Sequence, residues 1–325
     1  MKILFTSTQV TSFIREDVEI LQRHFHVNRL TTRGFRALIT IPLGVLRADV
    51  TFTWFASVYS AVVVFFARLF GKPSIVVIGG VDVAKYPEIQ YGIWLNPWKA
   101  ILVKYAMRHA HRLLIVDPFQ KGEAMRLAEY DGGNIEYAAT GYDANAWIPS
   151  AGKEQIVLTV AACTDEGRLK AKGFDFLIRS AKLLPDIKFV VVGISEQIVE
   201  KARRDAPSNM EIIPFVERRD LLPLYQKAKV YCQPSYIEGL PNALCEAMLC
   251  ECVPVGTNVG GIPTAIGDAG FLVPYGDATA LSSAIQNALQ TPSSMGARAR
   301  ERIAKGFTLR QREEALVRIL SKAVQ

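Results

Sequence analysis

The sequence predicts an α/β protein built from two doubly wound parallel sheets, and three observations lead to this fold class. Short apolar runs alternate with stretches of helical spacing along most of the chain. The alternation starts again after a segment rich in Gly, Pro, Ala and Asn near residues 140–153. The length of 325 residues suits two domains better than one. We therefore expect each half to form its own sheet, with crossover helices between the strands.

The first half begins with a strand, and its elements follow in a regular order. We expect strands at 2–8, 26–30, 49–55, 74–80 and 112–117, a helix at 16–25 and a basic stretch at 31–47. Residues 50–67 carry no charge and just reach the length of a membrane-spanning segment. Their Thr, Ser and Tyr side chains, and the strand directly after them, favour a strand, a turn and a buried helix instead.

The second half repeats the pattern and ends in a helix. Strands are expected at 156–162, 188–193, 211–216, 230–235, 253–258 and 270–274, and one amphipathic helix covers 307–325. We place the N-terminal domain at 1–148, the C-terminal domain at 149–305 and the C-terminal helix at 306–325. That helix packs on the nearer domain or returns across the linker to the N-terminal domain. Two such units would place a ligand cleft at the carboxyl ends of their strands.

The composition excludes several classes of protein. The 38 Lys and Arg outnumber the 31 Asp and Glu by seven, and the first 150 residues share the excess with the rest of the chain. Because a nucleic-acid binder concentrates its positive charge, we expect no nucleic-acid partner. The five Cys are odd in number and form no CxxC pair, which favours buried reduced thiols in a cytoplasmic protein. The first residues lack the long apolar core of a signal peptide.

Common catalytic motifs are absent from the sequence. It contains no GxGxxG, GxxxxGK[ST], GxSxG or HExxH, which disfavours nicotinamide and flavin sites, P-loop nucleotide hydrolysis, serine hydrolases and zinc proteases. No two Asp residues stand two positions apart, so a DxD metal site is missing as well. The four His occur as two close pairs, more typical of packing or surface positions than of metal ligands.

The informative segment is 231–277, in which Glu238 and Glu246 flank the start of a helical run. Gly239, Leu240 and Pro241 stand between a strand end and this run, and Pro241 suits a first helical position. Free amides of residues 240–243, Asn242 among them, would then form an anion site suited to a diphosphate. Glu238 can reach a sugar lying against the helix, and Glu246 can accept hydrogen bonds from a ribose diol. The alternative is two surface carboxylates beside an ordinary helix start.

This segment resembles the C-terminal signature of glycosyltransferase family 4, a family of retaining enzymes with the GT-B fold. The resemblance rests on EGLPNALCEAM, PVGTNVGGIP and AGFLVPYGD at the expected intervals. It implies two Rossmann-like domains that face each other across a cleft, the first binding the acceptor and the second the donor. It also implies transfer of a hexose from a nucleotide diphosphate sugar to a hydroxyl acceptor, a glycan or a lipid-linked molecule, with no cofactor and no essential metal.

The resemblance carries roles onto individual residues. Glu238 would lie by the donor sugar, Glu246 would hold the ribose, and Lys172, from the Lys172-Gly173 pair, would meet the leaving diphosphate. The usual Arg position falls on Ala161 or Ala162, so Arg168 is the candidate to replace it from a longer loop. Lys172 and Arg168 would otherwise be solvated loop charges.

Further donor contacts follow from the same resemblance. Gly260 and Gly261 would let the backbone approach the donor closely. Phe215 and Val216 are candidates for the base pocket, or else ordinary strand packing. Cationic side chains and helix amides can stabilise a leaving diphosphate without a metal.

The sequence departs from the family pattern on the acceptor side. Gly79, followed by Gly80, stands where a His is common, and Asp82 is the nearest polar residue that could supply chemistry there. A loop or capping Asp is the alternative for Asp82. Thr11 and Ser12 would line the cleft from the first loop, with Phe13. Two positions of the C-terminal domain also differ, Thr264 where Glu is frequent and Glu251 where Gly is frequent.

The stretch from Ile20 to Ala48 contains no acid and is rich in arginine. It carries Arg23, Arg29, Arg33, Arg36 and Arg47, interleaved with Phe35, Leu38 and Ile39. A basic amphipathic helix of this kind can lie on an anionic membrane, so we expect peripheral association with the cytoplasmic face. The alternative is a solvated basic face with an ordinary buried side.

Two other functions stay open at this point. The first is another GT-B enzyme acting on a sugar phosphate, an epimerase or a phosphorylase. The second is a catalytically weak subunit that binds a nucleotide sugar, favoured by Gly79 at the usual His position.

Overall fold

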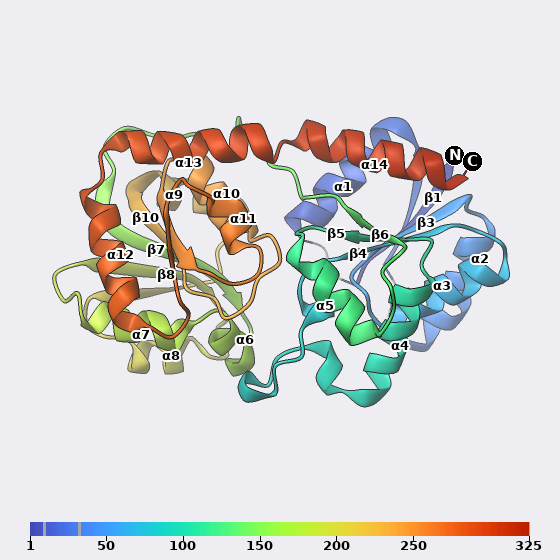
Figure 1. The fold of residues 1–325 in the computed structure, drawn as a ribbon, viewed down its shortest axis with the longest axis horizontal. Helices are drawn as coiled ribbons and strands as arrows, with labels where there is room; N and C mark the ends of the chain where they lie inside the picture. Colours follow the sequence, from blue (N-terminus) through green and yellow to red (C-terminus); the bar gives the residue numbers. More distant parts are fainter. Residues whose placement is uncertain (9–10, 32–33, 325) are drawn as a thin grey trace. The chain divides into compact units, whose positions relative to one another are not determined.

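The computed structural model describes residues 1–8, 11–31 and 34–324, and it divides the chain into two compact units. The N-terminal unit consists of Met1–Gly141 and Leu309–Gln325, and the C-terminal unit of Tyr142–Thr308 (Figure 1). Each unit has a six-stranded, wholly parallel sheet. This confirms the α/β class with two doubly wound sheets.

The N-terminal sheet has the strand order β2-β1-β3-β4-β5-β6. Its strands are β1 (Lys2–Thr6), β2 (His26–Leu30), β3 (Val50–Trp54), β4 (Ser74–Ile78), β5 (Arg112–Ile115) and β6 (Ile135–Tyr137). Its helices are α1 (Ser12–His24), α2 (Ala37–Leu46), α3 (Val58–Leu69), α4 (Pro97–His109), α5 (Phe119–Ala128) and α14 (Leu309–Val324). Four short 3₁₀ turns lie at Gly34–Arg36, Val81–Val83, Pro87–Ile89 and Ile93–Leu95. The strand β6 was not predicted because it has only three residues and none of them is fully buried.

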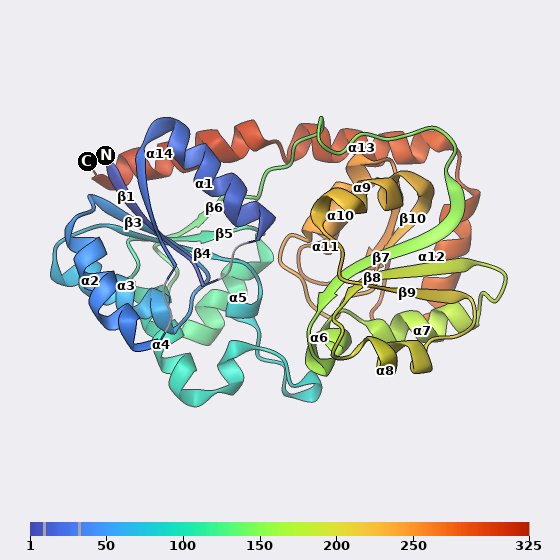
Figure 2. The same ribbon diagram turned by 180° about the vertical axis from the view of Figure 1, so that it is seen from behind.

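The helices of this unit form two layers (Figures 1 and 2). The helices α2 to α5 pack on one face of the sheet around two apolar clusters, one centred on α2 and α3 and the other on α3, α4 and α5. The helices α1 and α14 pack together on the other side. The uncharged segment 50–67 is thus a strand and a helix, as expected. The helix is only partly buried, since Phe65 and Leu69 are exposed.

The C-terminal sheet has the order β12-β11-β10-β7-β8-β9. Its strands are β7 (Glu154–Cys163), β8 (Lys188–Ile194), β9 (Met210–Pro214), β10 (Ala228–Gln233), β11 (Val253–Thr257) and β12 (Phe271–Val273). Its helices are α6 (Glu166–Ala171), α7 (Phe174–Lys182), α8 (Val199–Asp205), α9 (Arg218–Lys227), α10 (Asn242–Leu249), α11 (Ile262–Ile266), α12 (Ala278–Gln290) and α13 (Ser293–Gly306). All five Cys are buried and unpaired, as expected.

None of the helices in residues 1–8, 11–31 and 34–324 is both long and apolar enough to cross a membrane.

A buried ion pair holds α14 in the N-terminal unit. The guanidinium of Arg312 donates to both carboxylate oxygens of Asp17 on α1, at 2.9 and 2.6 Å. It also donates to the carbonyl of Ala138 at 2.7 Å, and the indole of Trp54 donates to Asp17 at 2.9 Å. The two charged side chains are 1% and 4% exposed. Removing one member would leave an uncompensated buried charge, which is far more costly than losing a surface pair.

Replacing Arg312 with Met should therefore lower the free energy of unfolding of the N-terminal unit by about 3–5 kcal/mol. Arg310→Met is the matched control on the same helix, because its pair with Glu314 is largely exposed, and it should cost less than about 1 kcal/mol. Calorimetric unfolding of both variants measures the difference. Equal effects would contradict the importance of the buried pair.

Candidate functional site: the strand ends of the C-terminal unit

The connection order of the C-terminal sheet creates a switch point between β7 and β10. From β7 the chain runs outward through β8 and β9, and β10 then pairs with the other side of β7. The loops after β7 and β10 consequently leave their strands in opposite directions. Ligands of open α/β sheets bind at such points, beyond the carboxyl ends of the strands.

A close backbone contact fixes the turn between α6 and α7 against the loop after β10. Gly173 has a φ of +71°, and a Cβ on it would lie 1.9 Å from the carbonyl oxygen of Pro234. The amide of Tyr236 donates to the carbonyl of Ala171 at 2.8 Å. Glycine is therefore required at 173 both by backbone conformation and by space. The contact places Lys172 beside the loop that carries Glu238.

The carboxylate of Glu238 is the centre of this loop. Its Oε1 accepts hydrogen bonds from the Lys172 ammonium at 2.6 Å, from the Gln233 amide at 2.8 Å and from the Ser235 hydroxyl at 2.8 Å. The Glu238 side chain is 12% exposed and that of Lys172 is 30% exposed. All three bonds end on one oxygen, so the second oxygen takes no part in them. The structure thus brings together two of the residues predicted from the sequence.

Gln233 and Ser235, which orient Glu238, were not predicted from the sequence. Gln233 is the last residue of β10, and its amide also donates to the Ser235 hydroxyl at 2.8 Å, while the hydroxyl of Tyr231 lies 3.1 Å from its carbonyl oxygen. Thr257 at the end of β11 donates to the backbone carbonyl of Ser235 at 2.6 Å. The signal available in the sequence was a buried strand ending in polar residues.

Arg168 lies apart from this centre. Its guanidinium pairs with Asp165 at 3.5 Å, and both side chains are about half exposed. Asp165 also accepts a hydrogen bond from the Arg168 amide at 2.9 Å and so caps α6. The geometry of Arg168 is that of a surface pair at a helix start.

The helix α10 begins one residue later than predicted. Pro241 is its N-cap, with extended backbone dihedrals, and Asn242 is the first helical residue. The Pro ring at the cap removes a donor, so the amides of Asn242, Ala243 and Leu244 are the first-turn amides of α10. Gly239 and Leu240 are buried in the loop before it. The Asn242 side chain accepts a hydrogen bond from the Tyr142 hydroxyl at 2.8 Å.

Glu246 lies inside α10 and is almost fully buried, with 5% of its side chain exposed. Its Oε1 accepts two hydrogen bonds from the guanidinium of Arg218, at 3.0 and 2.8 Å. The Tyr225 hydroxyl donates to its Oε2 at 3.4 Å. Arg218 begins α9, and its guanidinium lies 5.2 Å from the ring centre of Trp147. Arg218 was not predicted, because nothing in the pattern of α9 connects it to a helix 28 residues away.

The glycine pair at 260 and 261 approaches protein backbone. Gly260 has a φ of +53°, and a Cβ on it would lie 2.2 Å from the Glu238 carbonyl oxygen. The Gly261 amide lies 3.3 Å from the same oxygen and donates to it. The two glycines therefore pack the β11–α11 loop against the Glu238 backbone. Glu251, where the family usually has Gly, has a φ of +63°, which explains that usual choice.

The two base-pocket candidates follow β9. The strand ends at Pro214, so neither residue is part of it, and the expected strand at 211–216 was too long. The Phe215 ring is 69% exposed, whereas Val216 is half-buried. Ordinary strand packing therefore does not account for Phe215.

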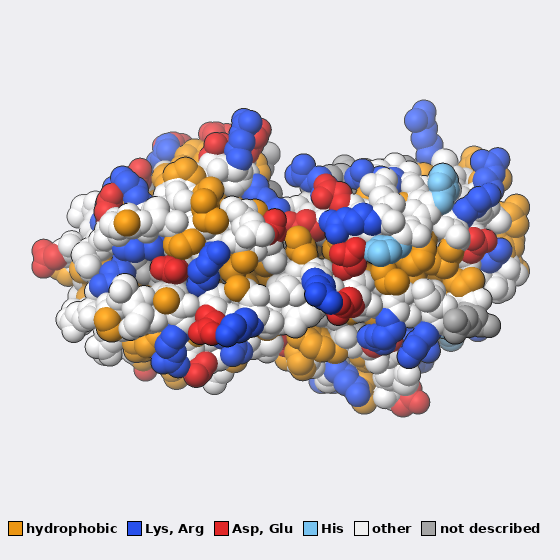
Figure 3. All heavy atoms as spheres, turned by 90° about the horizontal axis from the view of Figure 1, so that it is seen from above, with side chains coloured by type: hydrophobic (Ala, Val, Ile, Leu, Met, Phe, Trp, Pro, Cys, Tyr) orange, Lys and Arg blue, Asp and Glu red, His pale blue; other side chains and the backbone are white. Residues whose placement is uncertain are grey.

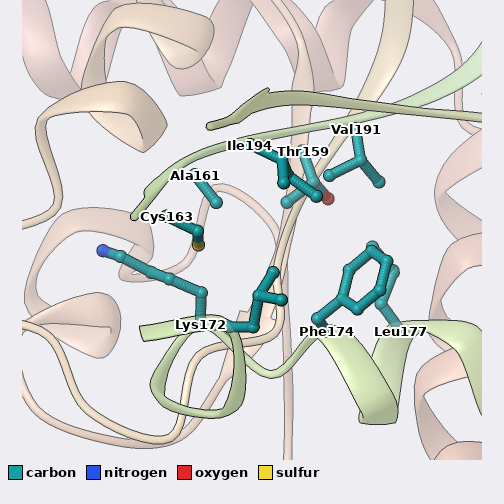
Figure 4. Close-up of a pocket in the computed structure, with 9 residues that line it drawn as sticks. Thr159, Ala161, Cys163, Lys172, Phe174, Leu177, Val191 and Ile194 are labelled. Atoms are coloured by element: carbon teal, nitrogen blue, oxygen red, sulfur yellow. The ribbon is translucent and has the colours of Figure 1, made fainter. Parts of the chain in front are cut away.

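A small apolar pocket lies next to Lys172 (Figure 4). Its lining includes Ala161, Cys163 and Phe174. Lys172 lies at the rim, with its ammonium pointing away from the pocket. Burial raises the pKa of the Cys163 thiol to about 11. The nearby charges of Lys172 and Arg168 lower this pKa, but by less than burial raises it. This thiol is therefore protonated at neutral pH and is not a nucleophile.

The acceptor-side candidates lie after strands of the N-terminal unit. Thr11 is the N-cap of α1 and Ser12 is its first residue, and the Thr11 hydroxyl is buried without a hydrogen-bond partner. A Cβ on Gly79 would lie 2.7 Å from the ring of Phe55, which itself has a φ of +70°. The Phe55 ring thus fills the space that a larger residue at 79 would need.

Asp82 is fully buried beneath the same loop. Its Oδ2 accepts a hydrogen bond from the Gly79 amide at 2.5 Å, and its Oδ1 is buried without a partner. Burial raises the pKa of this carboxyl to about 7, against the lowering effect of backbone amides such as that of Gly79. Gly80 has a φ of +151°, which lets the chain turn over the carboxyl. The Asp82 side chain therefore shapes the loop that carries Gly79.

Comparison with known proteins places the C-terminal sheet in a family. Residues 155–291 match the model of the family described as glycosyl transferases group 1. This segment is thus similar to the group 1 glycosyl transferases. It contains Glu238, Glu246 and Lys172.

Curated relatives are glycosyl transferases too. The chain is 27% identical over 189 residues to the D-inositol 3-phosphate glycosyltransferase of Mycobacterium sp. strain KMS, a match covering 53% of this chain and 43% of that protein. It is 34% identical over 97 residues to the O-antigen chain mannosyltransferase B of Escherichia coli, covering 30% of this chain and 25% of that protein. The chain therefore matches less than half the length of these curated relatives.

Solved structures match nearly the whole chain. Anabaena HepE, crystallised with UDP and glucose, aligns with a TM-score of 0.82 at 15% identity, covering 99% of this chain and 100% of that one. Sucrose-phosphate synthase from Thermosynechococcus elongatus aligns with a TM-score of 0.79 at 16% identity, covering 99% and 98%. The group 1 glycosyl transferase segment thus lies in a chain with the GT-B fold.

The contact at Gly173 can be tested by substitution. Gly173→Ala should destabilise the C-terminal unit by more than about 3 kcal/mol, because it adds a steric clash to an unfavourable φ. Gly152→Ala is the control, since Gly152 has a φ of +82° and a Cβ on it would meet no atom within 4 Å; it should cost only about 1–2 kcal/mol. Denaturant unfolding measures both, and equal costs would contradict the close contact with Pro234.

The buried carboxyl predicts a pH dependence of stability. Between the ordinary pKa of 3.8 and the native value of about 7, the folded protein retains a proton on Asp82 that the unfolded chain has lost. The free energy of unfolding should therefore fall as pH rises through this window, by an amount on the order of a few kcal/mol. Above it, both states are ionised and the penalty is complete.

Asp82→Asn should remove this component of the pH profile, while Asp131→Asn, at an exposed position of the same unit, should leave it. Thermal unfolding between about pH 4 and pH 8 measures the difference between the variants. A profile unchanged by Asp82→Asn would be the contrary result.

Proposed function

We propose that this protein transfers a hexose from a nucleotide diphosphate sugar to a hydroxyl acceptor, a glycan or a lipid-linked molecule. We further propose that the transfer retains the anomeric configuration and needs no metal. The observation that carries the proposal is the Lys172–Glu238 pair at the switch point of a group 1 glycosyl transferase segment. The names of the relatives, which include a mannosyltransferase and a protein bound to UDP and glucose, support the donor class.

Charge stabilisation is the main task in this reaction. Breaking the bond between the sugar and the diphosphate builds negative charge on the leaving oxygens. In the proposal, the Lys172 ammonium and the first amides of α10 meet that charge. A cation and a helix N-terminus are an anion site in themselves, which supports a transfer that needs no metal. Addition of EDTA should then leave the rate unchanged.

Glu238 has the role of holding the donor sugar. Because Lys172, Gln233 and Ser235 all bond to its Oε1, the carboxylate cannot turn when a sugar binds. Its other oxygen is the proposed acceptor for a sugar hydroxyl. Such fixed orientation reduces the reorganisation needed in the transition state.

Glu246 is proposed to bind the ribose hydroxyls. The Arg218 guanidinium already holds this carboxylate and is the more exposed partner, at 37% against 5%. The ribose therefore competes with Arg218 for the same oxygen. Phe215, exposed beyond β9, and Val216 are the proposed contacts of the base.

The remaining parts of the proposal concern the N-terminal unit. We assign acceptor binding to this unit, with contacts from Thr11, Ser12, Gly79 and Gly80, and a cytoplasmic, peripheral location. The carboxyl of Asp82 has a pKa raised by burial to about 7, so it can hold or release a proton near neutral pH. Because Asp82 is buried, we propose that it acts indirectly, by supporting the loop that carries Gly79.

One observation favours a second candidate. Gly79 occupies the position where the family commonly has a His, and the Phe55 ring fills the adjacent space. A subunit that binds the nucleotide sugar with little turnover fits this feature. Donor binding without product formation across an acceptor panel would select this second candidate.

A donor screen followed by site variants tests the proposal. Purified protein is heated with UDP, GDP, ADP and dTDP sugars, and the donor should raise the melting temperature by binding linkage. With that donor, Glu246→Gln should weaken binding about tenfold or more because the ribose loses an ionised acceptor.

Lys172→Met should lower kcat by about 100-fold with little change in donor affinity, as expected for a group that meets charge developing in the transition state. Lys170→Met, at an exposed position of α6 two residues before Lys172, is the matched control. The anomeric configuration of the product, observed by NMR, tests retention. No binding by any nucleotide sugar would overturn the proposal.

A further inference from the structure

The helix α2 is apolar on all its sides. Its ten residues, Ala37–Leu46, include no charged side chain. Ala37, Ile41 and Val45 are buried in the core of the N-terminal unit, whereas Ile39, Leu43 and Leu46 are about half or more exposed. The exposed residues recur at helical spacing and so form one outward stripe. A helix that is hydrophobic all round normally has both sides covered.

The neighbouring helices extend this apolar stripe. Helix α3 packs against α2 and α4 packs against α3, and all three lie on one face of the first sheet (Figures 1 and 2). Their exposed large apolar side chains are 48–68% accessible: Leu38, Ile39, Leu43, Leu46, Phe65, Leu69, Trp98 and Ile101. We call these eight residues the apolar face. Contiguous exposed patches of this kind mark interaction sites.

Positive charges outnumber negative charges around the apolar face. Residues 34–109 contain eight Lys and Arg and only three acids. Of the acids, Asp82 is buried and Asp49 accepts a hydrogen bond from the Lys2 amide. Of the eight cations, Lys104 on α4 pairs with Glu129. Arg68 lies in the last turn of α3, and Lys72 follows the end of that helix.

The other helical layer of the same unit is different. Along α14, Arg310 pairs with Glu314 and Arg318 pairs with Glu136. The surface seen in Figure 3 accordingly mixes blue and red side chains. The layer formed by α2, α3 and α4 combines exposed apolar side chains with an excess of positive charge.

We propose that the apolar face of α2, α3 and α4 docks on an anionic lipid bilayer. Apolar side chains flanked by Lys and Arg, with a Trp among them, are suited to the boundary between headgroups and acyl chains. A second copy of the chain fits less well, because a self-complementary contact would bring two positive rims together. This inference specifies which surface gives the peripheral location named in the proposed function. It rests on the proposed function only for the reason why the protein would bind a membrane.

Vesicle flotation tests the docking. The full chain is mixed with vesicles of phosphatidylcholine alone or with about 30% phosphatidylglycerol, at low and high salt. The wild type should float with the anionic vesicles, and less so at high salt. The triple variant Ile39→Gln, Leu43→Gln, Leu46→Gln should bind at least about tenfold more weakly.

A matched triple variant controls for loss of surface hydrophobicity. Ile148→Gln, Leu183→Gln, Leu272→Gln changes three exposed apolar residues of the C-terminal unit and should float like the wild type. Arg68→Gln, Lys72→Gln should weaken binding to anionic vesicles while leaving the apolar face intact. Both triple variants should keep the wild-type melting temperature, because their target side chains are exposed.

Three results would overturn the inference: no flotation of the wild type, equal flotation of the α2 variant, or a dimer in light scattering that the α2 variant abolishes. Donor binding by the α2 variant is measured in the same preparations. If the α2 variant binds the donor normally but no longer floats, the result supports docking. If the wild type binds the donor but does not float, the docking inference is rejected and the proposed function is not. Failure of the proposed function would appear as absent donor binding, which is a separate readout.

Discussion

The hydrogen bonds that end on one oxygen of Glu238 are the constraint around which the candidate donor site is built. Lys172 lies in the turn between α6 and α7, and Gln233 and Ser235 belong to β10 and the loop after it. These segments meet only because the sheet reverses its order between β7 and β10 and because Gly173 has no Cβ to strike Pro234. The position of the Glu238 carboxylate thus depends both on the strand order of the sheet and on the glycine at position 173.

The two buried carboxylates that pair with arginine differ in what surrounds them. Asp17 and Arg312 are both enclosed, so their pair holds α14 on the N-terminal unit and offers nothing to a ligand. Glu246 is equally buried, but Arg218 keeps a third of its surface in solvent. A ligand can replace an exposed guanidinium at modest cost, because that group regains hydration on leaving. The same ion-pair chemistry is therefore closed to ligands in one unit and partly open to solvent in the other.

The N-terminal unit combines an unusual loop with an unusual surface. At the end of β4, Gly79, the Phe55 ring and a buried Asp82 replace the polar arrangement that the family commonly has. On the helical layer α2 to α4, exposed apolar side chains lie among positive charges. Both features lie in the unit to which we assign acceptor binding.

The sequence by itself determined the fold class, most of the strands, the motif that contains Glu238 and Glu246, and the separate Lys172-Gly173 pair. Periodicity, turn residues and local spacing all depend on residues close together along the chain, so a single sequence shows them. Only the tertiary structure decided which groups touch them. Arg218 lies 28 residues from Glu246 along the chain, the neighbour of Gly260 is the Glu238 carbonyl, and Arg168 lies with Asp165. The prediction for Arg33 lies outside the described residues. Contacts between distant segments depend on how strands are ordered in a sheet, and no local pattern encodes that order.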